Sequence, residues 1–118
     1  MAKKILIVDD AQVDRTSLER IVVEAGHFAL LAESGSQALE RAKNDQPDLI
    51  FMDVNMPGMD GFAATRKLKA DDATKSIPVV FVSSKNQKAD QAWGQMLGAK
   101  AYISKPYSRE QILNQLAG

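Results

Sequence analysis

The sequence contains no cysteine among its 118 residues. Disulfides, thiolate metal sites and cysteine nucleophiles are therefore excluded. A surplus of charge of one sign is also missing, because 15 lysines and arginines are balanced by 15 aspartates and glutamates. This balance weighs against a nucleic-acid-binding protein, which usually carries a basic surplus.

Long apolar runs are absent as well. Residues 5–8 form an apolar run after Lys3 and Lys4, but this run ends at Asp9 and is too short for a signal peptide. No stretch approaches the roughly 20 apolar residues of a membrane-spanning helix. We therefore expect a cytoplasmic protein without membrane insertion. The length is enough for one compact core, and we expect a single domain over residues 1–118.

What the sequence does contain is a repeated alternation of two patterns. Short apolar runs recur at residues 5–8, 28–31, 49–52, 79–82 and 101–103, and most are continuous rather than alternating. Continuous runs are typical of strands that are covered on both faces, and the segments between them show helical spacing. The sequence therefore predicts an α/β fold. We expect a flavodoxin-like (βα)5 doubly wound sandwich, with a five-stranded parallel sheet in the order 2-1-3-4-5.

Local signals mark the ends and the buried faces of the predicted helices. Ser34 and Ser108 stand at capping positions, each followed three residues later by a glutamine. In the fourth helix, Ala89, Trp93 and Met96 recur at helical spacing. We interpret this stripe as packing against the sheet rather than as a recognition surface.

Polar side chains follow four of the five predicted strands. Asp9 and Asp10 follow the first strand, Asp53 the third, Ser83 the fourth and Lys105 the fifth. All strands of a parallel sheet end at the same edge, and ligands bind there. The expected strand order makes the first and third strands neighbours, so the three aspartates should meet at this edge.

Three clustered carboxylates repel one another. At a separation of ~4 Å and an effective dielectric of ~20, each pair costs about 4 kcal/mol. The cluster must therefore take up protons or bind a cation, and oxygen ligands open to water suit Mg²⁺. A carboxylate beside Mg²⁺ can attack phosphorus and become an aspartyl phosphate. Lys105 and the Ser83 hydroxyl would then hold oxygens of the phosphoryl group.

These residues also resemble a known family, the CheY-like receiver domains of two-component response regulators. The resemblance spans nearly the whole chain in the family's order. The matching segments are Asp9-Asp10, residues 53–61 (DVNMPGMDG), Ser83-Ser84, and residues 98–106 (GAKAYISKP). The resemblance implies that Asp53 is the phosphoacceptor. It also implies that Asp10, Asp53 and the backbone carbonyl of Asn55 bind Mg²⁺, with Asp9 assisting through water.

The resemblance has further implications for the switch and the partners. Ser83 and Lys105 would hold the phosphoryl group, Tyr102 would be an aromatic switch, and the bond between Lys105 and Pro106 would be cis. A sensor histidine kinase would donate the phosphoryl group to a monomer that turns over no external substrate. Because the pattern occupies the whole chain, we expect output through contact with a downstream protein. Residues 92–94 and 98–99 further resemble regulators of pilus-based (twitching) motility.

Simpler interpretations are open for the single residues. Asp9 or Asp10 would also serve as a cap of the following helix, and so would Ser83. Lys105 would also be at home in solvent, and Tyr102 as a half-buried core aromatic. None of these interpretations accounts for the appearance of all the polar groups at one sheet edge.

Three other functions also fit parts of the pattern. A phosphatase of the haloacid-dehalogenase type forms an aspartyl phosphate, but its second aspartate is replaced here by Ala11. A flavin or dinucleotide carrier would need a glycine-rich loop after the first strand, and none follows it. A degenerate receiver that only binds partners would not need the complete acidic set and Lys105.

Overall fold

The computed structural model describes residues 2–117, in which five strands and five helices alternate. The strands are β1 (Lys4–Val8), β2 (Phe28–Ala32), β3 (Leu49–Met52), β4 (Val79–Ser83) and β5 (Ala101–Ser104). The helices are α1 (Gln12–Glu24), α2 (Gly35–Asp45), α3 (Gly61–Ala70), α4 (Lys88–Met96) and α5 (Arg109–Leu116). The strands form one parallel sheet in the order β2-β1-β3-β4-β5. The predicted fold class and strand order are confirmed.

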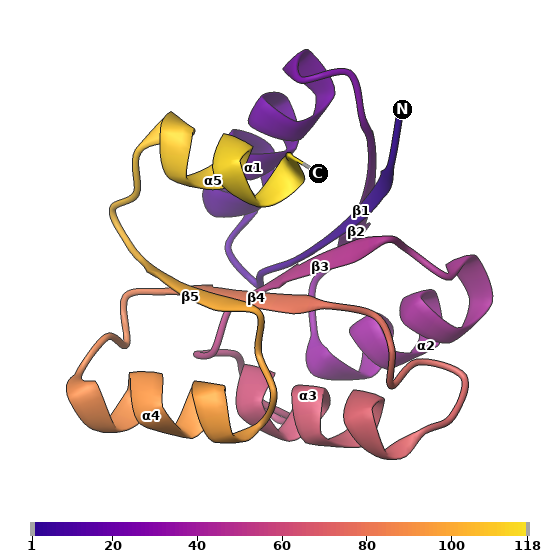
Figure 1. Cartoon of the computed structure of the whole chain (residues 1–118), viewed down its shortest axis with the longest axis vertical. Helices are drawn as coiled ribbons and strands as arrows, with labels where there is room; N and C mark the ends of the chain where they lie inside the picture. The colour runs from indigo at the N-terminus through magenta and orange to yellow at the C-terminus, as the bar shows by residue number, and fades with distance from the viewer. Residues whose placement is uncertain (1, 118) are drawn as a thin grey trace.

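The helices cover both faces of the sheet, with α1 and α5 on one side and α2, α3 and α4 on the other (Figure 1). Successive residues of β1 therefore enter different cores. Leu6 packs in the same apolar cluster as Leu68 of α3, whereas Ile7 packs in the cluster that contains Val22 of α1 and Ile112 of α5. Every residue of β3 and β4 is buried. This two-sided cover explains why the apolar runs are continuous.

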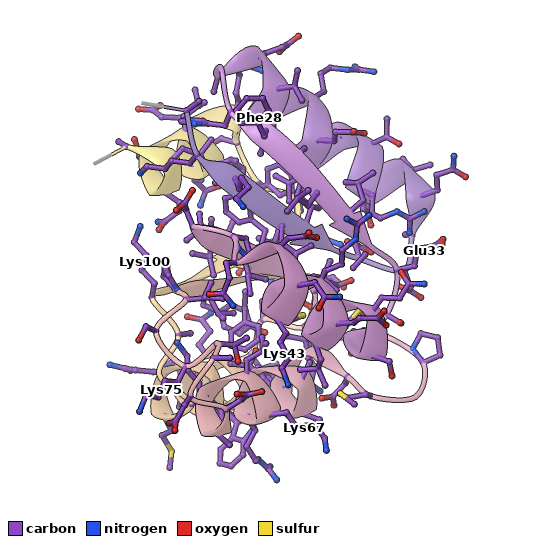
Figure 2. The ribbon with its side chains drawn as sticks, turned by 90° about the vertical axis from the view of Figure 1, so that its right-hand side faces the viewer. Phe28, Glu33, Lys43, Lys67, Lys75 and Lys100 are labelled. Atoms are coloured by element: carbon purple, nitrogen blue, oxygen red, sulfur yellow. The ribbon has the colours of Figure 1, made fainter. Side chains whose placement is uncertain are left out.

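Strand β2 forms an edge of the sheet, and Figure 2 views the molecule from that side. Phe28, at the start of β2, is 65% exposed. Only the last residue of the strand, Ala32, is buried. The edge position explains this exposure, because a neighbouring strand pairs with β2 on one side only.

The predicted caps are confirmed in their main features. The Ser34 hydroxyl accepts a hydrogen bond from the backbone N–H of Gln37 at 3.1 Å and begins α2. Ser108 and Gln111 form a complete capping box at the start of α5. Among residues 2–117, no helix combines the length and the apolar character that crossing a membrane requires.

The predicted packing stripe of α4 is wrong. Its members are all exposed: Ala89, Trp93 and Met96. The buried residue of this helix is Gly94, because its lack of a side chain lets α4 approach the aromatic rings on the sheet. An ideal Cβ at position 94 would lie 3.0 Å from Cδ2 of Tyr102 and 3.1 Å from Cδ2 of Phe81. The close approach thus rotates the helix so that the larger apolar side chains face outward.

Candidate functional site

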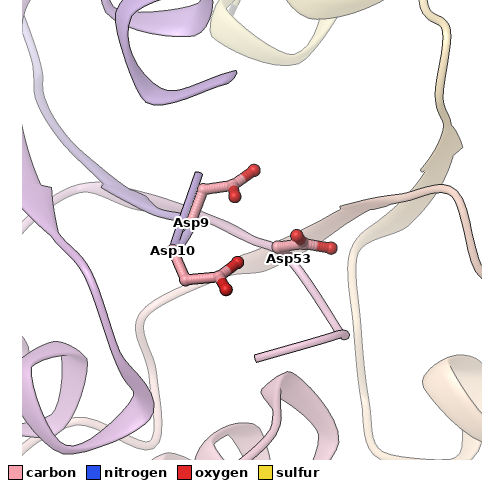
Figure 3. Close-up of side chains that lie close together, drawn as sticks. All are labelled: Asp9, Asp10 and Asp53. Atoms are coloured by element: carbon pink, nitrogen blue, oxygen red, sulfur yellow. The ribbon is translucent and has the colours of Figure 1, made fainter. Parts of the chain in front are cut away.

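The ends of β1 and β3 bring the three aspartates together. In the parallel register Val8 lies opposite Met52, and the backbone N–H of Asp53 donates to the carbonyl of Val8 at 2.9 Å. Asp9, Asp10 and Asp53 each place a carboxylate oxygen within 4.8 Å of the others. Figure 3 shows the three carboxylates directed into the same space. The predicted convergence at this sheet edge is confirmed.

The three carboxylates differ in exposure and in bonding. Asp9 is 5% and Asp53 7% exposed. One oxygen of Asp9 accepts from the N–H of Ala11 at 2.9 Å, and one of Asp53 accepts from the N–H of Val54 at 2.7 Å. Asp10 is exposed, and its carboxylate has no hydrogen bond or ion pair within the described part of the chain. This carboxylate is therefore available to a ligand.

A simple capping role does not explain the acidic pair. The N-cap residue of α1 is Ala11, and no side chain caps this helix. Asp10 therefore makes no capping bond, and Asp9 satisfies only the N–H of the N-cap residue itself. The position of both residues is better explained by the cluster they form with Asp53.

Among residues 2–117, Lys105, directly after β5, is the lysine whose ammonium pairs with this acidic group. Its Nζ lies 2.8 Å from Asp9, 3.0 Å from Asp14 and 3.4 Å from Asp53. The Lys105 side chain is only 17% exposed, so the interpretation of a solvated lysine is wrong. The Lys105–Pro106 bond is cis, as the resemblance implies.

Burial and the neighbouring charges shift the pKa of Asp53 and that of Lys105. Burial and then repulsion from Asp9 raise the pKa of Asp53, although Lys105 and the Ser83 hydroxyl act in the opposite direction. Burial alone would lower the pKa of Lys105, but its bonds to Asp9 and Asp14 and the charge of Asp53 raise that pKa well above its usual range. Lys105 therefore stays protonated, and Asp53 gives up its proton at a higher pH than a free aspartic acid side chain does.

One ammonium for several carboxylates leaves the site with excess negative charge. The donors are oxygens from three aspartates, one of them exposed and without a partner. Hard oxygen donors of this kind fit a small divalent cation such as Mg²⁺. Asn55 is an exposed residue of the loop between β3 and α3, and the ligand role of its carbonyl stays a prediction.

The side chains of Ser83 and Tyr102 both form hydrogen bonds with the backbone of Lys85. The fully buried Ser83 hydroxyl accepts from the N–H of Lys85 at 3.1 Å, and the Tyr102 hydroxyl donates to the carbonyl of Lys85. Burial, followed by the charges of Asp90 and Asp53, raises the pKa of Tyr102 to about 12. Tyr102 therefore remains a neutral donor at physiological pH. Ser83 is not a helix cap, because the N-cap of α4 is Gln87.

Sequence reasoning missed two residues of this site. Asp14 lies in the first turn of α1, which begins just after β1, and it reaches Lys105 from there. Lys85 takes part mainly through its backbone, and its ammonium pairs with Asp90 of α4 at 3.4 Å. The signal for Asp14 was its position, since the first turn of a helix that follows a parallel strand lies at the same sheet edge.

The sequence is similar to known proteins over nearly its whole length. Residues 5–117 match the family model of the response regulator receiver domain. The chain is 40% identical over 113 residues to Protein PilH of Pseudomonas aeruginosa, covering 96% of this chain and 93% of that protein.

Two solved structures have the same architecture. One is the chemotaxis protein CheY4 of Vibrio cholerae, with a TM-score of 0.91, 28% identity, and coverage of 98% of this chain and 97% of that one. The other is the receiver domain of the sensor histidine kinase PA1611 of Pseudomonas aeruginosa, which has a magnesium ion coordinated in its active-site cleft. It gives a TM-score of 0.89 at 28% identity and covers 98% of this chain and 95% of that one. From the family match, the sequence identity and the shared fold, we conclude that the chain belongs to the response regulator receiver domain family.

Proposed function

We propose that Asp53 accepts a phosphoryl group from a sensor histidine kinase, with Mg²⁺, and that the change of surface is then recognised by a downstream protein. The observation that carries the proposal is the convergence of Asp9, Asp10, Asp53 and Lys105 at the carboxyl end of the sheet. Membership of the receiver family supports it. The protein acts as a switch, and its own phosphorylation is the signal.

The chemistry needs little more than positioning and charge compensation. A carboxylate oxygen of Asp53 attacks the phosphorus of the donor, and a new P–O bond forms. The bond to the phosphohistidine nitrogen breaks, and its electron pair leaves with the imidazole. Lys105 and the Ser83 hydroxyl hold oxygens of the transferred group. Lys105 already lies 3.4 Å from the Asp53 carboxylate.

Mg²⁺ would be held by Asp10, Asp53 and the carbonyl of Asn55, with Asp9 assisting through water. It would supply positive charge for the carboxylates and a phosphoryl oxygen. The cluster of oxygen donors and the excess of negative charge support this assignment. The related receiver of PA1611 holds magnesium in its active-site cleft.

Phosphorylation by a small donor tests the proposal directly. Incubation with acetyl phosphate and Mg²⁺ should add one phosphoryl group per chain, measured by intact mass. Chelation of the metal should prevent the addition, and hydroxylamine should remove the group, because an acyl phosphate is sensitive to that nucleophile. A chain that takes up no phosphoryl group under these conditions would refute the proposal.

Asp10→Asn should test whether Asp10 is a metal ligand. If the wild type binds Mg²⁺ with a dissociation constant on the order of 1 mM, about 10 mM metal adds roughly 1.4 kcal/mol to its stability. The variant should lose most of this gain and phosphorylate poorly. Without metal it should be slightly more stable than the wild type, since one repelling charge is gone. Urea melts with and without Mg²⁺ measure both effects, and an unchanged response to the metal would place the metal site elsewhere.

The rival function is a phosphatase-like enzyme that turns over an external phosphate ester. Such an enzyme needs a second carboxylate two residues after its nucleophile to protonate the leaving group. In that family the nucleophile ends the first strand, which would make it Asp9 here, and the residue two positions later is Ala11, the N-cap of α1. Steady release of phosphate from an ester, beyond one equivalent per chain, would favour the enzyme over the switch.

The output step involves Tyr102. The Ser83 hydroxyl and the Tyr102 hydroxyl bind the N–H and the carbonyl of the same residue, Lys85. When Ser83 turns toward a phosphoryl group, its bond to Lys85 is lost, and the surroundings of the Tyr102 ring change. The ligand thereby shifts a two-state equilibrium through its differential affinity for the two states.

Tyr102→Ala should therefore uncouple phosphorylation from output. The variant should still accept a phosphoryl group on Asp53, because the Tyr102 hydroxyl bonds to the backbone carbonyl of Lys85 and not to a carboxylate. It should lose most of its phosphorylation-dependent binding to the partner captured by wild-type protein in the beryllofluoride state. A pull-down that compares both proteins measures this. Equal binding by the variant would exclude Tyr102 as the switch.

The pathway is the most specific part of the proposal. We place the chain in a chemotaxis-like system for pilus-based motility, as a monomer that contacts a kinase and a target protein. The likeness to Protein PilH and the sequence at residues 92–94 support this placement. Deletion of the gene should then impair twitching motility, and a deletion strain with normal twitching would contradict the placement.

A further inference from the structure

Asp14 is the carboxylate of the site that the proposed chemistry does not use. It lies in the first turn of α1, and its carboxylate is 3.0 Å from the Lys105 ammonium. This distance is shorter than the 3.4 Å between Lys105 and Asp53. The Asp14 side chain is 45% exposed, whereas those of Asp9 and Asp53 are 8% and 9% exposed. Asp14 thus joins the site from its solvent side.

We propose that Asp14 is a positioning residue that holds the Lys105 ammonium and limits how strongly Lys105 binds a phosphoryl group on Asp53. The inference rests on the proposed function, since it concerns the same phosphoacceptor. It adds a residue that tunes the stability of the phosphorylated state.

The hydrogen-bonding capacity of lysine carries the argument. An ammonium group has three N–H donors and no acceptor. In the structure the Lys105 ammonium bonds to three carboxylates, those of Asp9, Asp14 and Asp53. All of its donors are therefore engaged. A phosphoryl oxygen that takes a donor from Lys105 has to share it or replace one of these partners.

Asp14 is the partner that is released at the lowest cost. A carboxylate that leaves an ion pair must be hydrated again, and this is easy for a side chain that is already 45% exposed. Asp9 is almost fully buried, so its release would leave a buried charge without compensation. Competition between Asp14 and the phosphoryl group is therefore built into the site.

Asp14→Asn should strengthen the binding of a phosphoryl mimic. At saturating Mg²⁺ the variant should bind beryllofluoride about two- to fivefold more tightly than the wild type, as expected for removal of a partly exposed ion pair. Asp14→Glu keeps the charge and should restore an affinity near that of the wild type. Glu19→Gln is the matched control, because Glu19 lies on the same helix, whereas Lys105 bonds to Asp9, Asp14 and Asp53.

A second measurement examines the ion pair without any phosphoryl mimic. The Lys105 ammonium resonance, observed by NMR of 15N-labelled protein, should shift in Asp14→Asn and stay unchanged in Glu19→Gln. An unchanged resonance would show that Asp14 does not hold Lys105 in solution, and the inference would fall while the proposed function stood.

The binding results separate the two ideas as well. If Asp14→Asn binds beryllofluoride no more tightly than the wild type, the positioning role is wrong. An equal gain in Glu19→Gln would show a general effect of net charge and would also overturn it. If the wild type itself fails to bind beryllofluoride at saturating Mg²⁺, the proposed function fails, and the role of Asp14 in it fails too.

Discussion

Asparagine in place of Asp53 should abolish phosphoryl incorporation. The amide lacks the negative oxygen that attacks phosphorus, so treatment with acetyl phosphate and Mg²⁺ should leave the mass of the variant unchanged. The fold should survive, because the amide oxygen still accepts from the N–H of Val54, which binds Asp53 at 2.7 Å in the wild type. Intact-mass measurement decides the result, and labelling at the wild-type level would place the acceptor elsewhere.

Asp60→Asn provides the matched control for this prediction. Asp60 is another aspartate close to the site, and its side chain caps α3 by accepting from the N–H of Ala63 at 2.8 Å. Asparagine caps nearly as well as aspartate. This variant should take up one phosphoryl group like the wild type, so that only the loss of Asp53 changes the mass result.

Asp53→Asn should also change how the stability of the metal-free protein depends on pH. Burial and repulsion from Asp9 raise the pKa of Asp53 in the folded protein, so the folded state binds its proton more tightly than the unfolded chain. This contribution to stability is complete below the unfolded pKa and is lost as pH rises through the folded pKa. Asparagine does not titrate. The stability of Asp53→Asn relative to the wild type should therefore increase over this pH range in urea melts at several pH values.

Gly61→Ala should be the most destabilising single change at the site. The first residue of α3 lies directly against the backbone that carries the phosphoacceptor. An ideal Cβ at position 61 would be 2.0 Å from the carbonyl oxygen of Asp53, and the Gly61 N–H donates to the carbonyl of Val54 at 2.9 Å. Backbone cannot move aside as a flexible side chain does. We expect the free energy of unfolding to fall by about 3 kcal/mol or more, which is the upper range for overpacking of a tight site.

Gly58→Ala separates this steric effect from backbone strain. Gly58 lies in the same loop with a φ of 75°, and a Cβ there would meet nothing within 4 Å. The Gly58→Ala variant should lose only about 1 kcal/mol of its free energy of unfolding, because a left-handed φ disfavours alanine modestly. Chemical denaturation of both variants measures the two losses. If Gly61→Ala were no worse than Gly58→Ala, the close approach of α3 to Asp53 would not hold in solution.

The sequence by itself determined the sheet and the central carboxylates. Continuous apolar runs indicated strands covered on both faces, and the alternation with helical segments left a parallel sheet as the simplest arrangement. In such a sheet every strand ends at the same edge, so Asp9, Asp10, Asp53 and Lys105 had to come together there. This reasoning needs only strand direction and strand order, which local patterns and chain topology supply.

The tertiary structure alone decided which neighbours these residues have. Asp9 and Asp10 are adjacent and join the same cluster, yet Asp9 is buried against Lys105 while Asp10 is exposed. The side of α4 that faces the sheet is set by Gly94, which an apolar pattern in the sequence does not mark. Because glycine has no side chain, the helix backbone can approach the aromatic rings of Phe81 and Tyr102. The ion pair between Asp14 and Lys105 joins residues 91 positions apart. Its place in the first turn after β1 puts Asp14 at the right edge of the sheet, but whether it reaches Lys105 depends on how α1 packs beside the end of β5.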